Sequence, residues 1–325
     1  MVKHAVSTVE NCWRWSIARH EMRIRLLVAV LVTAAALTGF VSMLARAQGA
    51  AAAWSASLGA MRATAGLIPG RRPLRINVVK FAESRRTKNF SVKGAAAEPS
   101  VQARTAFQVV YADGVVMVDA GMDQQVHRFF GRGVEEPYDS AASAQVARAL
   151  TAARLIVVTH EHGDHVAGVI HTPQASELAA KTILTRAQIQ TLLTAPQMPD
   201  IALTPDTAAR YRVVDYDKYF ALAPGIALIK AAGHTPGSQM VYVALESGAE
   251  YLLIGDATWH MDGVRQIVGK DAPWITEDQS AVMDQLRWLN ALSRSEPQLV
   301  IVASHDEEER MRLITTGKLG GRFEF

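Results

Sequence analysis

Residues 154–165 read Arg-Leu-Ile-Val-Val-Thr-His-Glu-His-Gly-Asp-His, and this stretch decides the fold of the chain. Its first half is apolar and β-branched, which predicts a strand that is buried on both faces. Directly after that strand stand four side chains of the kinds that bind metals: His160, His162, Asp164 and His165. Gly163 supplies the turn that lets them converge, and imidazole with carboxylate is a donor set typical of zinc. The alternative is a histidine-rich surface loop without a metal.

Three further apolar runs end in the same way, each with a potential ligand two or three residues beyond it. The pairs of run and ligand are Ile226–Ala231 with His234, Tyr251–Ile254 with Asp256, and Leu299–Ala303 with His305. Alone, each of these side chains is as easily a hydrogen-bonded loop residue or a helix cap. Their common placement favours a shared cation, because burying such groups is costly unless they are paired.

The remaining pattern predicts a layered α/β body. Asp113-Gly114 joins two β-rich runs, 107–112 and 115–119, as a hairpin. A further strand is expected at 239–244, and helices are expected at 141–153, 177–180, 187–193 and 277–292. Nearly continuous apolar strands indicate sheets that are covered on both faces, with the helices outside.

These residues resemble the metallo-β-lactamase superfamily. Its HxHxDH motif matches residues 160–165, and Gly-His-Thr-Pro-Gly at 233–237, Asp256 and His305 complete a pattern of seven ligands. The resemblance covers about residues 76–325 and implies a four-layer αββα sandwich with the site at one edge of its two sheets. It also implies that Asp119, in an early Asp-x-Gly element, supports the site without binding metal.

The same resemblance implies two divalent metal ions, with zinc the expected metal. One ion would be held by His160, His162 and His234, the other by Asp164, His165 and His305, and Asp256 would bridge them. Such a pair lowers the pKa of a bound water from 15.7 toward 7, which makes hydroxide available to attack a carbonyl carbon. Asp164 and Asp256 are the candidate catalytic carboxylates, with Asp256 passing a proton to the leaving group. The expected activity is hydrolysis of a small ester, lactone or related carbonyl compound.

Within the superfamily, the chain looks most similar to the N-acyl homoserine lactonases. They share the carboxylate at position 256 and the final His305-Asp306 pair, but they carry a tyrosine where this chain has Trp259. An indole N–H donates a hydrogen bond but, unlike a phenol hydroxyl, cannot accept one, so Trp259 does not fully replace that tyrosine. A β-lactam or thioester hydrolase of the same fold is an alternative, and so is a non-catalytic metal-binding module anchored at a membrane.

Six other residues are weighed against the site. His127 and His171 are expected to be ordinary surface histidines, and His260 is expected to be structural. Trp259, Met261 and Trp274 are candidates for either the core or the lining of a pocket.

Composition excludes several other classes of protein. The chain has 325 residues, of which 49% are hydrophobic. It contains a single cysteine, which excludes a disulfide framework and a cysteine zinc ribbon. The net charge of +3 comes from the leader: residues 1–47 hold six Lys or Arg and two Glu, which leaves 28 basic and 29 acidic residues in the rest. A nearly neutral body has no electrostatic footprint for nucleic acid.

The N-terminal region predicts export. Residues 26–44 are apolar and uncharged, and Arg23 and Arg25 precede them. This is either a signal peptide that ends at the small-x-small site formed by Ala45 and Ala47 or an uncleaved membrane anchor. The positive-inside rule sends the body out of the cytoplasm, into the periplasm or another extracytoplasmic space. Residues 1–47 are thus the leader, 48–73 an Ala- and Gly-rich linker, and 74–325 the hydrolase domain.

Export is testable with a reporter fused after Phe325. Because the basic flank holds the start of the apolar run in the cytoplasm, a reporter that is active in the cytoplasm alone should stay inactive. The measurement is reporter activity in whole cells, with a fusion that lacks residues 1–47 as the control. Strong activity of the full-length fusion would contradict export.

Overall fold

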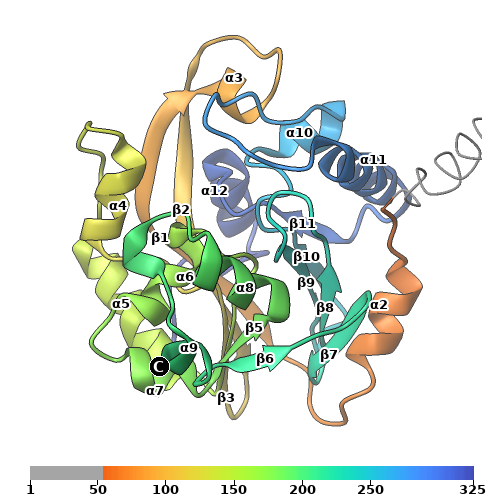
Figure 1. Cartoon of the computed structure of the whole chain (residues 1–325). Coiled ribbons are helices and arrows are strands. Elements are labelled where there is room, and N and C mark those ends of the chain that lie inside the picture. Colours follow the sequence, from red (N-terminus) through yellow and green to blue (C-terminus); the bar gives the residue numbers. More distant parts are fainter. Residues whose placement is uncertain (1–53) are drawn as a thin grey trace, which may run out of the picture. The chain divides into compact units, whose positions relative to one another are not determined.

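The computed structural model describes residues 54–325, which form one compact unit, and the leader with its apolar run lies outside them. Two mixed sheets pack face to face (Figure 1). In the described part of the chain no helix is both long and apolar enough to cross a bilayer. The predicted α/β architecture is confirmed.

The first sheet has the order β1-β2-β3-β4-β5-β6. The antiparallel pairs β1–β2 and β2–β3 form a meander, and β3 to β6 run parallel. Its strands are β1 (Arg75–Thr87), β2 (Pro99–Tyr111), β3 (Gly114–Val118), β4 (Leu155–Val157), β5 (Thr182–Thr185) and β6 (Arg212–Val214). The predicted hairpin is confirmed as β2 and β3, with Tyr111 paired to Gly114.

The second sheet has the order β11-β10-β9-β8-β7, and all its pairs except the parallel β10–β11 are antiparallel. Its strands are β7 (Tyr219–Ala223), β8 (Ile226–Lys230), β9 (Gln239–Ala244), β10 (Glu250–Leu253) and β11 (Val300–Val302). The strands predicted from apolar runs at 226–231, 239–244, 251–254 and 299–303 are thereby confirmed.

Helices cover the outer faces of both sheets (Figure 1). Over the first sheet lie α4 (Gln124–Gly131), α5 (Ser140–Ala152), α6 (Gly163–Ile170), α7 (Ala175–Ala179), α8 (Arg186–Thr194) and α9 (Pro205–Ala208); over the second lie α2 (Leu58–Ala65), α10 (Met261–Gln266) and α11 (Gln279–Ser295). The short α3 (Lys88–Ser91) follows β1, η1 (Pro199–Ile201) follows α8, and α12 (Glu307–Thr315) follows β11. The four predicted helices are confirmed as α5, α7, α8 and α11.

Three apolar layers hold this sandwich together. Between the sheets, Phe107 and Val109 of β2 pack with Ile226 and Leu228 of β8. Strand residues in this layer are almost wholly buried, which explains the uninterrupted apolar runs of the sequence. The other two layers lie between each sheet and its helices. With the two sheets fixed in this way, their strand ends meet along one seam.

Helix α2 corrects the predicted linker at residues 48–73. Ser57 caps this helix, and Leu58, Met61 and Ala65 are buried in the same apolar layer as strands β8 and β9. The alanine and glycine content suggested a tether, but an apolar residue every three to four positions is enough to build one helical face. Residues 58–65 therefore belong to the folded body.

The role of α2 predicts the cost of truncating Met61. Met61→Ala should lower the free energy of unfolding by about 2–5 kcal/mol, the range for removing a large buried apolar side chain. Urea unfolding followed by far-UV circular dichroism measures the change. Leu67→Ala is the control because Leu67 is 71% exposed. Equal, small effects of the two substitutions would contradict the packing of α2.

Candidate metal centre

The seven predicted ligands follow the ends of four strands, one in the first sheet and three in the second. After β4 the chain passes through His160 and His162 and enters α6, whose first turn carries Asp164 and His165. His234 follows β8, Asp256 follows β10 and His305 follows β11. All of these side chains except that of His162 belong to residues that are at most 6% exposed. The structure therefore brings together every residue of the predicted set.

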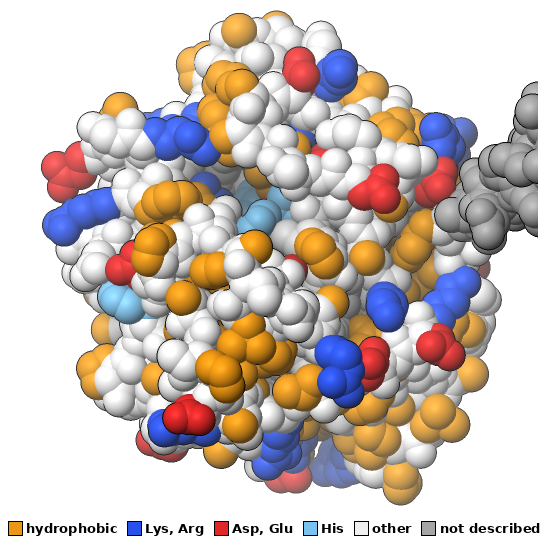
Figure 2. All heavy atoms as spheres, in the orientation of Figure 1, with side chains coloured by type: hydrophobic (Ala, Val, Ile, Leu, Met, Phe, Trp, Pro, Cys, Tyr) orange, Lys and Arg blue, Asp and Glu red, His pale blue; other side chains and the backbone are white. Residues whose placement is uncertain are grey.

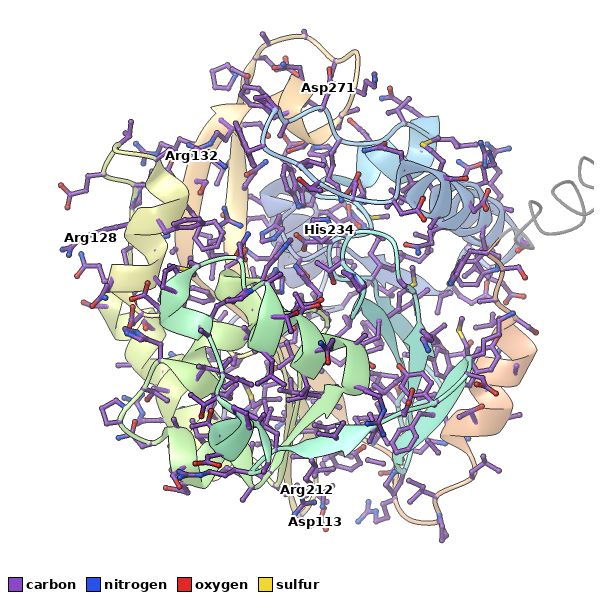
Figure 3. All side chains as sticks on the ribbon, in the orientation of Figure 1. Asp113, Arg128, Arg132, Arg212, His234 and Asp271 are labelled. Atoms are coloured by element: carbon purple, nitrogen blue, oxygen red, sulfur yellow. The ribbon has the colours of Figure 1, made fainter. Side chains whose placement is uncertain are left out.

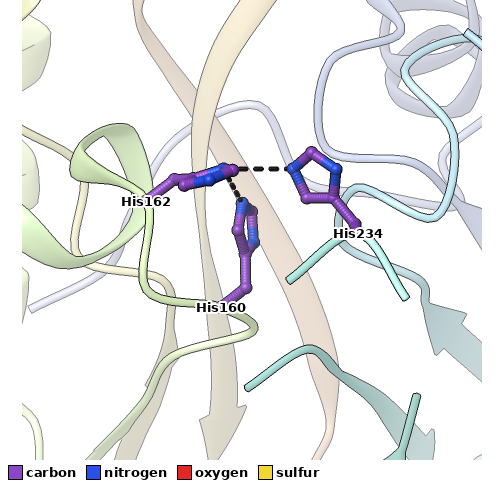
Figure 4. Close-up of side chains that lie close together, drawn as sticks. All are labelled: His160, His162 and His234. Carbon is purple, nitrogen blue, oxygen red and sulfur yellow. Dashed lines mark hydrogen bonds between the residues drawn. The ribbon is translucent and has the colours of Figure 1, made fainter. Parts of the chain in front are cut away.

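Three histidines form the first group (Figure 4). His162 Nδ1 lies 3.2 Å from His160 Nε2 and 3.1 Å from His234 Nε2. Three ring nitrogens this close together repel one another when all carry protons or all present lone pairs. A single cation between them would be bound by all three lone pairs. The group is suited to hold a metal ion.

Asp164, His165 and His305 form the second group. His305 Nε2 lies 3.3 Å from His165 Nε2 and 3.4 Å from Asp164 Oδ2. This donor set also fits a metal ion. Its mixture of imidazole and carboxylate is typical of sites for zinc and related divalent ions.

Asp256 lies between the two groups. Its Oδ2 is 3.7 Å from His160 Nε2 and 3.5 Å from His234 Nε2, and its Oδ1 is 3.4 Å from His165 Nε2. His305 Nε2 lies 3.1 Å from both oxygens. The hydrogen bond with His305 is made by Oδ2, whereas the buried Oδ1 makes none of suitable geometry with the described residues. A buried carboxylate oxygen without a partner is costly, and a cation would satisfy it.

The protonation states favour metal binding. Burial lowers the pKa of His162 to about 4 and holds the pKa values of His160 and His234 well below the usual range. These three imidazoles are therefore neutral, which is the form that binds metals. Burial alone would raise the pKa values of Asp164 and Asp256. Arg104 and His165 outweigh burial at Asp164, and His305 and His165 outweigh it at Asp256, so both pKa values lie well below the usual range.

His165 differs from the other histidines. Burial lowers its pKa, but the carboxylates of Asp164, Asp119 and Asp256 together raise it well above the usual value. Its Nδ1 donates to Asp119 Oδ2 at 2.8 Å, so Nε2 is the nitrogen directed at the second group. Without a cation, a proton on His165 offsets the surrounding negative charge, and a metal ion would take over that task.

Asp119 supports the loop as the sequence predicted. It adopts a left-handed backbone conformation with φ of 64°, and its Oδ1 accepts from the Thr159 backbone N–H at 2.7 Å. Its side chain therefore fixes both the start of the His160 loop and the ring of His165. Such outer contacts orient metal-binding histidines and raise their basicity.

A second supporting carboxylate, Glu277, was missed by the sequence analysis. His234 Nδ1 donates to Glu277 Oε2 at 3.0 Å, and Lys270 Nζ forms an ion pair with the same oxygen at 2.9 Å. The side chains of Glu277 and Lys270 are fully buried. Both residues precede α11 in a loop without a recognisable motif, so no sequence signal linked them to His234.

Arg104 was missed as well. It lies in β2, and its Nη1 donates to Asp164 Oδ2 while its Nη2 donates to Ser84 Oγ at 3.0 Å. Arg104 is 8% exposed, so its charge is almost wholly withdrawn from water. Arg104 is the one charged residue of β2, and this was the available signal, because a charge in a buried strand needs a partner.

Trp259 lies at the site and makes a specific contact. Its Nε1 donates to Asp256 Oδ2 at 2.8 Å, and the residue is 9% exposed. The indole therefore holds the carboxylate that stands between the two groups. This is a role that needs a donor alone, which an indole supplies.

The other weighed residues lie outside the ligand groups. The prediction of a surface position was wrong for His127, which is 2% exposed and stacks against Tyr138 at 5.6 Å between ring centroids. His171 is partly exposed and pairs with Asp123 at 2.6 Å. His260 caps α10, and Met261 is buried in the layer behind the second sheet. Trp274 lines a pocket.

That pocket opens beside the candidate ligands and has a volume of about 390 Å³. His162, Asp164, His234, Asp256 and Trp259 reach its wall. In Figure 2 a histidine is visible at the bottom of a hollow, with basic side chains on one side of it. Its size falls in the range of small-molecule sites, which is roughly 300–1,000 Å³.

Residues 102–305 match the metallo-β-lactamase superfamily, and the chain belongs to this superfamily. The resemblance seen in the ligand motif is thereby confirmed. An N-acyl homoserine lactonase of a Bacillus species is 23% identical over 158 residues, which make up 48% of this chain and 57% of that protein. The match thus spans little more than half of that relative.

Solved structures share the fold. An N-acyl homoserine lactone hydrolase with the product N-hexanoyl-L-homoserine at its catalytic metal centre has a TM-score of 0.60 at 15% identity, covering 74% of this chain and 96% of that one. A B. thuringiensis protein with N-decanoyl-L-homoserine at its active site gives 0.60 at 16%, with 74% and 96% covered. A probable metal-dependent hydrolase from Staphylococcus aureus gives 0.57 at 15%, with 74% and 91% covered.

The supporting role of Asp119 predicts a loss of metal affinity without the loss of a ligand. Asp119→Asn should weaken zinc binding by about 10- to 100-fold, because an amide offers one acceptor oxygen where Thr159 and His165 now use two. Asparagine tolerates the left-handed backbone, so the change is confined to the side chain. Competition with a chromogenic chelator measures the affinity.

The control for this experiment is Asp113→Asn, at the exposed turn of the β2–β3 hairpin and far from the site along both strands (Figure 3). It should leave zinc affinity unchanged. Equal affinities of the Asp119→Asn variant and the parent protein would contradict the supporting role.

Proposed function

We propose that this protein is a dinuclear metal-dependent hydrolase of a small ester, lactone or related carbonyl compound. The observation that carries the proposal is the position of Asp256, whose carboxylate lies within 3.7 Å of histidines from both groups of potential ligands. One carboxylate placed in this way is suited to be shared by two ions. Membership of the metallo-β-lactamase superfamily and the lactonase among the relatives support the same reaction class.

The ligands divide as the geometry suggests. His160, His162 and His234 would hold one ion, Asp164, His165 and His305 the other, and Asp256 both. The donors are imidazole nitrogens and carboxylate oxygens, which fit zinc or a similar divalent ion. They are buried, and one of them, Oδ1 of Asp256, makes no hydrogen bond with the described residues. When bound, such ions supply Lewis acidity and make hydroxide available at neutral pH.

The protein's own side chains orient the reacting groups. A carbonyl substrate in the pocket would lie next to four residues that reach its wall: His162, Asp164, His234 and Asp256. Asp256 receives the proton of the attacking water and releases it to the leaving oxygen, and the bond from Trp259 keeps its Oδ2 in place. Asp164, held by Arg104, stays ionised and keeps its position beside His305. Taken together, these contacts prepare the site before the substrate arrives, which is a main source of catalytic rate.

We further propose that the body acts outside the cytoplasm, on the basis of the basic and apolar leader. The residues of that leader lie outside the described part of the chain.

The metal content of the purified protein tests the proposal. After expression with zinc, elemental analysis should find about two ions per chain, because the ligands form two groups that share Asp256. The same sample should hydrolyse at least one member of a panel of esters, lactones, thioesters and β-lactams, and removal of the metal should abolish this. Much less than one ion per chain would overturn the dinuclear site. Two ions without activity on any member would favour the non-catalytic metal-binding module.

The role of Asp256 predicts a specific kinetic defect. Asp256→Asn should lower kcat by at least about 100-fold, the lower end for the loss of a proton-transferring group, with a smaller effect on KM. Metal content is measured in the same sample, because the substitution also changes a ligand. Asp271→Asn, at an exposed loop position, is the control. Full turnover by Asp256→Asn with two ions retained would contradict this role.

A further inference from the structure

One wall of the pocket carries three arginines: Arg86, Arg104 and Arg132. Two of them are neutralised by neighbours. Arg86 pairs with Glu136 and donates to the Phe130 carbonyl oxygen at 2.7 Å, and Arg104 pairs with Asp164. Among residues 54–325, Arg132 has no carboxylate at salt-bridge distance. The wall therefore presents one positive charge that the described residues do not compensate.

The acidic residues of the pocket are all engaged elsewhere. Glu161 accepts from Thr235 Oγ1 at 2.8 Å and from the Gly237 N–H at 3.2 Å. Asp164 is bound by Arg104, and Asp256 is bound by Trp259 and faces the histidines. No carboxylate of the pocket lining is thus available to Arg132. If two divalent ions occupied the site, the positive character of the pocket would increase further.

Arg132 is held where a substrate would pass. It ends α4 in a left-handed conformation, with φ of 51° and ψ of 43°. Its guanidinium carbon lies 4.4 Å from the ring centroid of Trp274, which in turn packs against Phe90 at 5.2 Å. Many helices end in this conformation, and here the Arg132 N–H donates to the Phe129 carbonyl oxygen at 3.3 Å. The cation–π contact positions the guanidinium while its five N–H donors stay available to a ligand.

We propose that the substrate carries a carboxylate separate from its reactive carbonyl group, and that Arg132 binds this carboxylate. The inference rests on the proposed function and names the substrate class of the same pocket. A guanidinium matches a carboxylate with two parallel hydrogen bonds, which gives orientation as well as affinity. Figure 3 shows Arg132 on the side of α4 that faces His234, whereas Arg128 of the same helix lies at the outer edge.

The rest of the lining indicates what joins the two groups of the substrate. Phe129, Phe130 and Ile275 also reach the pocket wall. A short apolar linker between the carbonyl carbon and the carboxylate would pack against these side chains. Half-esters of aliphatic dicarboxylic acids, and lactones with an acidic side chain, have this chemistry.

A pair of matched esters tests the proposal on the metal-replete, full-length protein. Mono-p-nitrophenyl adipate and p-nitrophenyl hexanoate differ in one place, where the first has a carboxylate and the second a methyl group. The parent protein should prefer the adipate ester. Arg132→Gln should reduce the ratio of the two kcat/KM values by about 10- to 100-fold, the range for a hydrogen bond to a charged group, chiefly through KM. Arg132→Lys should restore part of the ratio because it keeps the charge without the planar fork.

Arg128→Gln is the matched control, since Arg128 lies in the last turn of α4 and does not line the pocket. It should leave the ratio unchanged. A binding experiment separates this proposal from the proposed function: adipic acid monoanilide and hexananilide are titrated by tryptophan fluorescence. If the acidic anilide binds more tightly than hexananilide to the parent protein, and this preference is lost in Arg132→Gln, the carboxylate site is supported. This holds even if neither ester is hydrolysed, because the lack of hydrolysis would contradict the proposed function and not the carboxylate site. Equal binding of the two anilides, or a preference that survives in Arg132→Gln, overturns the carboxylate site.

Discussion

The carboxylate of Asp119 holds the two parts of the site loop together, and the rest of the centre depends on it. One oxygen accepts a hydrogen bond from the Thr159 backbone N–H at the start of the histidine loop. The other accepts a hydrogen bond from Nδ1 of His165 at the end of that loop. The backbone repeats this connection, because the Ala120 N–H donates to the His165 carbonyl oxygen at 2.7 Å. Glycine is required at 168, since a Cβ there would lie 2.0 Å from the Ala120 carbonyl oxygen. Helix α6 can therefore approach the turn after β3 closely enough to aim Asp164 and His165 at the seam between the sheets.

Charge balance explains how so many polar groups can be buried along that seam. Three of the five ligand histidines have an outer partner: Asp119 for His165, Glu277 for His234 and the Ala103 carbonyl oxygen for His305. These partners take the Nδ1 proton and leave Nε2 directed at the centre. The cations Arg104 and Lys270 offset part of the carboxylate charge from outside. What stays unsatisfied, above all Oδ1 of Asp256, is what a metal ion would satisfy.

Much of this could be predicted from the sequence because the information is local. The apolar strands and the ligands at their ends lie within a few residues of each other, so periodicity and motif spacing identify both. Helix α2 was misjudged because its alanines and glycines resemble a tether until the sheet that it covers is known. Arg104, Lys270 and Glu277 reach the centre from β2 and from the loop before α11, and no short-range pattern connects them with His234 or Asp164. The stacking of Arg132 on Trp274 likewise joins segments about 140 residues apart, which only the fold brings together.

The central claim is that seven side chains hold two ions which share Asp256. X-ray absorption spectroscopy at the zinc edge of the zinc-loaded protein tests it most directly. The account predicts a first shell of nitrogen and oxygen without sulfur, together with a metal–metal distance of about 3.5–4 Å, the separation typical of two-metal hydrolytic sites. A spectrum that contains zinc–sulfur scattering, or a protein with two bound zinc ions and no metal–metal scattering, would contradict it.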